Sequence, residues 1–341
     1  MNSSWQDFLG ANGARFDGDL ITDFGDLNSE LAAAREATIV SPLGHLGVFE
    51  CAGEDAKVFL HNQLTSDVNH LAADTAQHSA WCTAKGRMQA SFLLYRSGND
   101  YRGLLSADLL PTIRNDMQKY VLRSKVKLAD LSAHLAVLGI SGPQAEFALQ
   151  AADLPVPADA LQTADFSDGK VICLDANRFL IVLAREKTPE LWAKLAANAR
   201  PVGTPVWRWL DIQAGLPLIT LATRECFVPQ MANFDQLGGV SFQKGCYPGQ
   251  EVIARTRYLG KIKRHLYRIH ADSALAAGTG IYAPENPESL LAMVVTAAPS
   301  PDGGFDALAV IQESLVDSGV LLFDAAGRTG LRASIVSPVG D

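Results

Sequence analysis

One short segment, Lys244 to Glu251, concentrates the residue types that can do chemistry; its one-letter sequence is KGCYPGQE. Its two glycines let the backbone bend close to a ligand, and its proline and following polar residues suit the first turn of a helix. Cys246 is therefore predicted on a loop that enters a helix. The free amides there, the positive end of the helix dipole and the neighbouring Lys244 would all favour a thiolate over a thiol. These are the surroundings of a reactive cysteine.

A purely structural interpretation of the same segment stays open. Cysteine is among the residue types most often buried, so Cys246 could be a packing residue. The two glycines could serve only a turn. Lys244 and Glu251 could be a solvated ion pair that contributes little to stability.

The sequence contains five cysteines: Cys51, Cys82, Cys173, Cys226 and Cys246. Their number is odd and no two have C-x-x-C spacing, so neither a disulfide scaffold nor a cysteine metal site is predicted. The first three lie in or next to apolar, strand-like runs that should bury them as neutral thiols. Cys226 follows two charged residues in a predicted loop. Cys246 is therefore expected to be the most reactive thiol, with Cys226 as its one competitor.

A basic strip follows the segment. The chain carries 29 basic and 37 acidic residues and a net charge of -8, which argues against a protein that holds nucleic acid over its whole surface. Six of the basic residues nevertheless fall between Val252 and Ile269, where there is no acid: Arg255, Arg257, Lys261, Lys263, Arg264 and Arg268. The strip could bind phosphates or carboxylates, or it could be a solvated strand edge whose charges block aggregation.

Several common signatures are missing from the sequence. It has no phosphate-binding P-loop, no strand-borne G-x-G-x-x-G, no H-E-x-x-H and no G-x-S-x-G. The seven histidines show no metal-ligand spacing, and no metal site is predicted. The apolar runs are too short to cross a bilayer, and the N-terminus lacks the pattern of a leader. The protein is therefore expected to be cytoplasmic, without a membrane partner.

Apolar runs alternate with turn residues along most of the chain, as strands and hairpins do. Helices are expected where a proline stands in the first turn of an apolar pattern of helical spacing. The main predicted elements are two strands flanking 42–44, a hairpin of 80–83 and 88–95 turned at 85–87, a helix over 109–122, a hairpin of 171–174 and 179–183, a helix from 188, and short strands beyond 261. The last region is expected to be a small β-barrel or sandwich.

The segment Lys244 to Glu251 matches the K-G-C-[YF]-x-G-Q-E signature of the YgfZ-type folate-binding proteins. The stretches 227–233, 237–242, 254–264, 53–60, 63–68 and 82–88 also resemble this family, so the likeness covers residues 40 to 265 in patches. These proteins are relatives of the glycine-cleavage aminomethyltransferase, the T-protein. They act in iron–sulfur cluster maintenance and support the modification of tRNA by iron–sulfur enzymes.

The resemblance implies an α+β protein of three parts arranged as a cloverleaf around a central channel. The parts would be a discontinuous folate-binding α/β domain of residues 1–130 and 205–255, a ferredoxin-like α+β domain of residues 131–204, and a C-terminal β-barrel of residues 256–341. Tetrahydrofolate or a one-carbon derivative would occupy the channel. That ligand needs hydrogen bonds at its pterin edge, an apolar wall for its aminobenzoate ring and cations for its glutamate carboxylates.

The resemblance and the chemistry of the segment together assign catalytic roles to Cys246 and Lys244. The residues expected to bind folate are Lys244, Gly245, Cys246, Tyr247, Gly249, Gln250, Glu251, Arg255 and Trp81, of which Tyr247 and Trp81 would supply the wall.

One hairpin departs from the transferase relatives, which carry an aspartate at the end of a G-G-I-x-D-D sequence. Here the matching residues read Gly86-Arg87-Met88-Gln89-Ala90-Ser91. Alanine can neither relay a proton nor stabilise a developing cation. The departure agrees with the YgfZ-type resemblance and speaks against aminomethyl transfer by that route.

The leading hypothesis is a folate-binding factor for iron–sulfur cluster assembly or repair that supports iron–sulfur enzymes, including tRNA-modifying ones, with Cys246 as its reactive centre. Whether it is an enzyme stays open. One alternative is a folate-dependent one-carbon transferase. A second is a non-catalytic scaffold that holds tRNA or a partner enzyme through the strip from Arg255 to Arg268.

Overall fold

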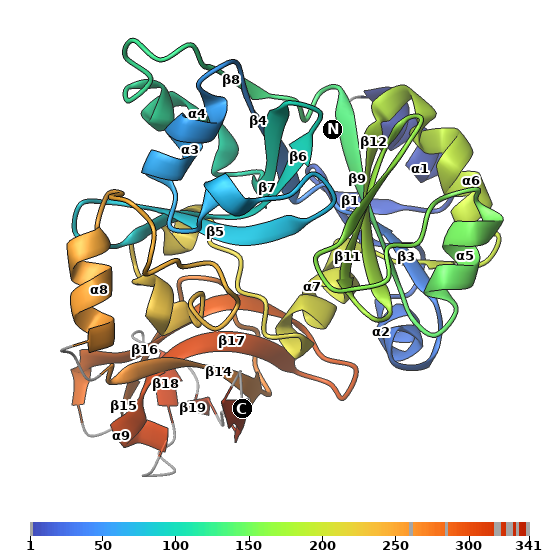
Figure 1. Cartoon of the computed structure of the whole chain (residues 1–341). Helices are drawn as coiled ribbons and strands as arrows, with labels where there is room; N and C mark the ends of the chain where they lie inside the picture. The colour runs from blue at the N-terminus through green and yellow to red at the C-terminus, as the bar shows by residue number, and fades with distance from the viewer. Residues whose placement is uncertain are drawn as a thin grey trace. The chain divides into compact units, whose positions relative to one another are not determined.

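The computed structural model describes residues 3–258, 262–283, 286–316, 322–324, 330–331 and 334–338. Contacts divide the chain into two compact units, each built from separate stretches. The first unit contains Met1–Lys57, His70–Gln77 and Leu93–Trp207, and the second contains Val58–Asn69, His78–Phe92 and Arg208–Asp341. Figure 1 shows the chain coloured from its N-terminus to its C-terminus.

The first unit contains a six-stranded sheet of order β10-β11-β12-β9-β3-β13. All its pairs are antiparallel except β13 with β3. Its strands are β3 (Ile39–Pro42), β9 (Leu135–Ser141), β10 (Thr163–Phe166), β11 (Gly169–Asp175), β12 (Arg178–Ala184) and β13 (Arg200–Pro201). The hairpin predicted for 171–183 is confirmed as β11 and β12.

Three helices cover this sheet: α1 (Ser3–Ala11), α5 (Ala145–Ala151) and α6 (Thr188–Ala196) (Figure 1). Their apolar residues and those of the strands form one core, in which Trp5 and Trp192 pack edge to face at 6.0 Å. The predicted helix at 188 is confirmed as α6, with Pro189 in its first turn. The same unit also holds β1 (Arg15–Asp17), β2 (Leu20–Asp23) and α2 (Leu27–Glu36).

A five-stranded antiparallel sheet has the order β5-β6-β7-β4-β8. Its strands are β4 (Leu46–Ala52), β5 (Ala76–Cys82), β6 (Met88–Ser97), β7 (Asp100–Ser106) and β8 (Lys127–Asp130), and the two units divide β5 and β6 between them. The turn between β5 and β6 is the predicted one, with Gly86 at φ 71°. The helix predicted from Leu109 is α4 (Leu110–Gln118), which ends four residues before the expected Leu122.

The second unit contains the signature and a C-terminal sheet. The chain reaches it through α3 (Ala56–Gln63) and α7 (Thr204–Gln213), passes the 3₁₀ turn η4 (Pro229–Ala232) and enters α8 (Gln250–Tyr258). The C-terminal sheet follows, and the short helix α9 (Glu313–Val316) comes directly after its strand β17 (Phe305–Gln312). Its strands are β14 (Arg264–Ala271), β15 (Gly280–Ala283), β16 (Asn286–Pro299), β17 (Phe305–Gln312), β18 (Leu322–Asp324), β19 (Gly330–Leu331) and β20 (Ser334–Pro338).

The C-terminal sheet has the order β19-β18-β15-β16-β17-β14-β20. Over the described residues β19 and β20 are its two edges, so no closed barrel is formed there, in contrast to the prediction. Apolar residues of β14, β15, β16 and β17, such as Ile269 and Ile311, form its core. The α+β character that the sequence predicted is confirmed.

Candidate functional site

The signature begins as a loop and ends as a helix. Helix α8 starts at Gln250, so Cys246 lies four residues before it, on the predicted loop. The loop closes onto the helix through two backbone hydrogen bonds, from Gln250 N to the Tyr247 carbonyl at 3.2 Å and from Ile253 N to the Gly249 carbonyl at 3.1 Å. Glu251 in the first turn and Arg255 in the last turn both complement the helix dipole.

Lys244 is turned into the protein. Its side chain is buried, and its ammonium donates to the backbone carbonyls of His61, of Leu64 at 2.6 Å and of Ser66 at 3.0 Å. The ring of Tyr247 lies 4.9 Å from Nζ. Because a lysine ammonium has three N–H donors, these carbonyls can engage all of them. Lys244 therefore ties the signature loop to the C-terminal end of α3, where helix carbonyls lack intrahelical partners.

Burial lowers the pKa of the Lys244 ammonium to about 8, and the charge of Asp67 opposes this shift only in part. An unfolded lysine keeps its proton up to a pH of about 10.4. Between these pH values the unfolded chain binds more protons than the folded chain, so this group makes the free energy of unfolding rise with pH.

Replacing Lys244 with methionine should remove that pH dependence. We expect the free energy of unfolding of the wild type to rise from pH 8 to pH 10 relative to Lys244→Met, by at most about 1.4 kcal/mol per pH unit. Urea titrations at pH 8, 9 and 10 measure it. The control is Lys263→Met, because Lys263 is exposed. Equal pH slopes for the wild type and Lys244→Met would show that this ammonium keeps its proton in the folded chain.

Cys246 is the exposed cysteine of the five, all of which lie in described parts of the chain. Burial raises the pKa of the other thiols, to about 12 for Cys51 and about 11 for Cys173, and also raises those of Cys82 and Cys226. The burial predicted for Cys51, Cys82 and Cys173 is confirmed, and Cys226 is half-buried.

Two glycines make a close contact between the signature and the hairpin of β5 and β6. Gly249 has φ 83°, and a methyl group there would lie 2.5 Å from the Thr83 carbonyl oxygen and 2.7 Å from the Cα of Gly86. Gly86 in turn lies against Val252 of α8. By contrast, a methyl group on Gly245 would meet only the His61 ring, 3.8 Å from Nε2. Gly249 is therefore required by both backbone conformation and space.

Both residues predicted to form an aromatic wall are buried. Trp81 is 1% exposed and donates from Nε1 to Gln63 Oε1 at 3.2 Å, and Tyr247 is 7% exposed. Burial, and secondarily Cys82, raises the pKa of the Tyr247 phenol.

The hairpin that departs from the transferases uses its polar side chains internally. Ala90 is fully buried, and the hydroxyl of Ser91 accepts from the backbone N of Ile219 at 3.0 Å. The amide oxygen of Gln89 accepts from Arg224 at 2.8 Å. No carboxylate stands at these three positions of the hairpin.

The basic strip is divided between surface and structural roles. Arg264 donates to the Leu290 carbonyl at 2.9 Å, and Arg268 donates to the carbonyl of Gln213 at 3.2 Å and to its side-chain oxygen at 3.0 Å. The exposed cations are Arg255, Arg257 and Lys263, while Lys261 lies outside the described residues. The guanidinium of Arg257 stacks 4.2 Å from the ring of Phe242.

Three polar residues near the signature had no role assigned from sequence: His61, Asp67 and Gln230. Nδ1 of His61 lies 3.2 Å from Oδ1 of Asp67. Gln230 donates to the Ile253 carbonyl at 2.7 Å, and its buried Oε1 has no hydrogen-bond partner among the described residues. The one available signal was the family-like stretch 63–68, which contains Asp67; no signal pointed to His61 or Gln230.

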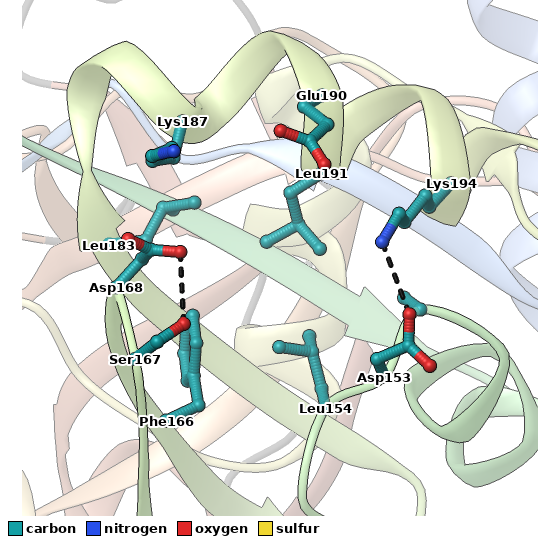
Figure 2. Close-up of a pocket in the computed structure, with 11 residues that line it drawn as sticks. Asp153, Leu154, Phe166, Ser167, Asp168, Leu183, Lys187, Glu190, Leu191 and Lys194 are labelled. Carbon is teal, nitrogen blue, oxygen red and sulfur yellow. Dashed lines mark hydrogen bonds and ion pairs between the residues drawn. The ribbon is translucent and has the colours of Figure 1, made fainter.

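A separate cavity of about 250 Å³ lies in the first unit, between α6 and the turn from β10 to β11 (Figure 2). Its lining combines apolar residues with charges of both signs, among them the Lys194–Asp153 pair at 3.2 Å. No predicted site residue lines it. Over the described residues, no three histidine, cysteine or acidic side chains cluster as metal ligands would.

Comparison with known proteins places the chain in a family. The model of the GCVT N-terminal domain matches residues 19–171. The tRNA-modifying protein YgfZ of Yersinia pseudotuberculosis serotype O:1b (strain IP 31758) is 34% identical over 230 residues, which cover 67% of this chain and 69% of that protein. The YgfZ protein of Shigella sonnei (strain Ss046) is 32% identical over 261 residues, or 76% of this chain and 78% of that protein. The chain belongs to the YgfZ family.

A solved structure agrees at the level of fold. The glycine cleavage system aminomethyltransferase T from Bartonella henselae matches with a TM-score of 0.77 at 16% sequence identity, over 99% of this chain and 97% of that one. The YgfZ-family chain therefore has the fold of a glycine-cleavage T-protein, as predicted. None of its helices in the described segments is long and apolar enough to span a bilayer.

Proposed function

We propose that this YgfZ-family protein is a cytoplasmic folate-binding factor for iron–sulfur cluster assembly or repair, and that it supports iron–sulfur enzymes, including tRNA-modifying ones. Cys246 is its reactive centre. The observation that carries the proposal is the single exposed thiol, on a loop in which the side chains of Lys244 and Tyr247 are buried. The relatives are named as tRNA-modifying proteins, which supports the link to tRNA.

The residues of the signature fit a folate in their chemistry. Glu251 and Arg255 are exposed and Gln250 is half-exposed, and the buried Gln230 Oε1 is an acceptor that lacks a donor. Carboxylate and amide groups suit the hydrogen-bonding edge of a pterin, and a guanidinium suits the glutamate carboxylates. Gln250, Glu251 and Gln230 would hold the pterin and Arg255 the tail. Bound tetrahydrofolate would supply a carrier for one-carbon units.

Within this site the roles of the protein's own groups differ. Lys244 is a positioning residue, because its ammonium is fully engaged by carbonyls of the α3 end and fixes the loop. Gly249 sets the path of the loop, and the ring of Tyr247 lies against the Lys244 ammonium. Cys246 supplies the thiol that reacts.

We expect folate binding without efficient one-carbon transfer. Tetrahydrofolate should raise the melting temperature, because a ligand that binds only the native state stabilises it. Transfer should be absent because Ala90 and Ser91 stand where the transferases carry their acid. Calorimetry with tetrahydrofolate and an aminomethyl-transfer assay measure the two properties. Turnover on an ordinary enzymatic scale would favour the transferase alternative, and absence of binding at saturating folate would overturn the folate proposal.

The scaffold alternative predicts binding through the exposed part of the basic strip. If Arg255, Arg257 and Lys263 hold tRNA phosphates, the affinity for tRNA should fall steeply with salt, and changing all three to glutamate should abolish binding. These positions are chosen because Arg264 and Arg268 have internal partners. Filter binding of tRNA at 50 to 300 mM salt tests this. Equal tRNA affinity of the wild type and the triple variant would show that the strip is a solvated strand edge and does not bind tRNA.

A further inference from the structure

The carboxyl end of α8 carries an aromatic–cation cluster of three side chains, Phe242, Arg257 and Tyr258, all in the second unit. The guanidinium of Arg257 lies 4.2 Å from the centre of the Phe242 ring, and the rings of Phe242 and Tyr258 are 6.2 Å apart at an interplanar angle of 76°. The backbone N of Ser241, next to Phe242, donates to the Thr65 carbonyl at 2.9 Å. Phe242 is therefore held by its backbone, and the two helix residues pack on its ring.

The ring of Tyr258 is open to solvent. Tyr258 is 65% exposed, more than any other tyrosine, phenylalanine or tryptophan whose burial the structure describes. An edge-to-face contact occupies at most one face of a ring, so Phe242 leaves at least one face of Tyr258 uncovered. A flat aromatic face that is both held and exposed is a surface on which a planar group can stack.

Two exposed arginines lie on the same helix as this ring. Arg257 stacks through the face of its guanidinium, which leaves the N–H edges to donate to an anion. Arg255 precedes Tyr258 by three residues and so lies on the same helix face. Two acids are also near: Glu251 in the first turn, and Asp235, whose pKa is raised by burial although Arg257 opposes that shift. The five donors of a guanidinium can serve a carboxylate and a second anion together.

We propose that the aromatic–cation cluster binds an unpaired nucleotide of RNA, with the base stacked on the open face of Tyr258 and the phosphate bound by Arg257. Proteins that recognise single-stranded RNA commonly combine an aromatic platform for a base with cations for the backbone. A base inside a duplex is covered on both faces, so the site selects unpaired nucleotides. Arg255 remains assigned to the folate tail, and the two ligands use different arginines. The inference rests on the proposed link to tRNA, whose loops contain unpaired nucleotides.

The test is the affinity of the full chain for three RNAs, measured by fluorescence anisotropy: tRNA, a short single strand of mixed sequence, and a duplex of that sequence. In Tyr258→Ala we expect the affinity for the single strand to fall about 5- to 100-fold, the effect of losing one base–aromatic contact. Tyr258→Phe keeps the ring and should bind within about twofold of the wild type, whereas Tyr258→Leu keeps only apolar area and should bind like Tyr258→Ala. The control is Tyr120→Ala, at another exposed tyrosine in the first unit, which should match the wild type.

Two results would overturn the inference. One is equal affinity of the wild type and Tyr258→Ala for the single strand. The other is an equal loss on single strand and duplex, because a surface that binds phosphates by charge alone needs no unpaired base. Misfolding does not account for a loss, since Tyr258 is exposed and its truncation opens no cavity, and an unchanged urea midpoint verifies this. As a second readout, ultraviolet crosslinking of tRNA should label the peptide that contains Tyr258, and the label should disappear in Tyr258→Leu.

Failure of this inference is distinguishable from failure of the proposed function. If the triple glutamate variant of the basic strip loses tRNA while Tyr258→Ala binds it normally, the stacking site is wrong and the link to tRNA stands. If the wild type binds none of the three RNAs, the inference is wrong, while support of iron–sulfur enzymes is decided separately by complementation. If Tyr258→Ala loses RNA affinity but restores methylthiolated tRNA in a strain that lacks this gene, the site is real and its part in the proposed function is wrong.

Discussion

Cys246 should react with iodoacetamide at least about 100-fold faster than Cys51, Cys82 or Cys173 in the folded protein at pH 7.5. The three slow thiols are buried, and burial raises their pKa values, so each must wait for a local opening before it can ionise and react. An opening free energy of about 3 kcal/mol is enough for a 100-fold effect. Mass spectrometry of each cysteine peptide at timed intervals measures all five rates in one sample.

Cys226 is the internal reference for this prediction. Cys226 is half-buried, and burial raises the pKa of its thiol, which Arg87 offsets only in part. Its alkylation rate should therefore fall between that of Cys246 and those of the three buried cysteines. In urea the five rates should converge, because the differences come from the folded structure. A folded-state rate for Cys246 equal to that of Cys226 would show that exposure and the loop give it no special reactivity.

Gly249→Ala should destabilise the second unit by about 2–4 kcal/mol and disorder the signature loop. Two effects combine: a left-handed φ of 83° and a new methyl group 2.5 Å from the Thr83 carbonyl oxygen. Neither contact atom can move alone, since Thr83 and Gly86 form the turn of the β5–β6 hairpin. The urea midpoint measures the stability, and limited proteolysis near Lys244 measures the order of the loop.

Two other glycines separate these effects. Gly238 has φ 71° and open space around its Cα, so Gly238→Ala carries only the conformational strain, about 1–2 kcal/mol. A methyl group on Gly245 meets nothing closer than 3.8 Å, so Gly245→Ala should change the stability by less than about 0.5 kcal/mol. If Gly249→Ala costs no more than Gly238→Ala, the contact between the hairpin and the signature is not tight.

Local features of the fold could be predicted from sequence where a single residue type has one physical use. Gly86 between two apolar runs marks a hairpin turn, and Pro189 marks a helix start, because each restricts the backbone without help from distant residues. The start of α8 at Gln250 follows from the same kind of signal. The open edges of the C-terminal sheet could not be predicted from local signals, since closure of a barrel depends on pairing between strands far apart in the chain.

The interior of the site could not be predicted in this way. The sequence places Lys244 beside Cys246, which led to the expectation that its charge serves the thiol. Its ammonium instead meets carbonyls of residues about 180 positions earlier, His61, Leu64 and Ser66. Backbone carbonyls leave no mark in side-chain patterns. For the same reason Arg264 and Arg268 looked like surface cations, although each has an internal partner.

The most direct test of the account is complementation of a strain that lacks this gene, with methylthiolated tRNA and iron–sulfur enzyme activities as readouts. Wild type and Cys226→Ala should restore both, because Cys226 is a half-buried thiol outside the signature. Cys246→Ala should accumulate as a folded protein, since its side chain is exposed and its removal leaves no cavity, and yet restore neither. Full restoration by Cys246→Ala would contradict the account and make Cys246 dispensable.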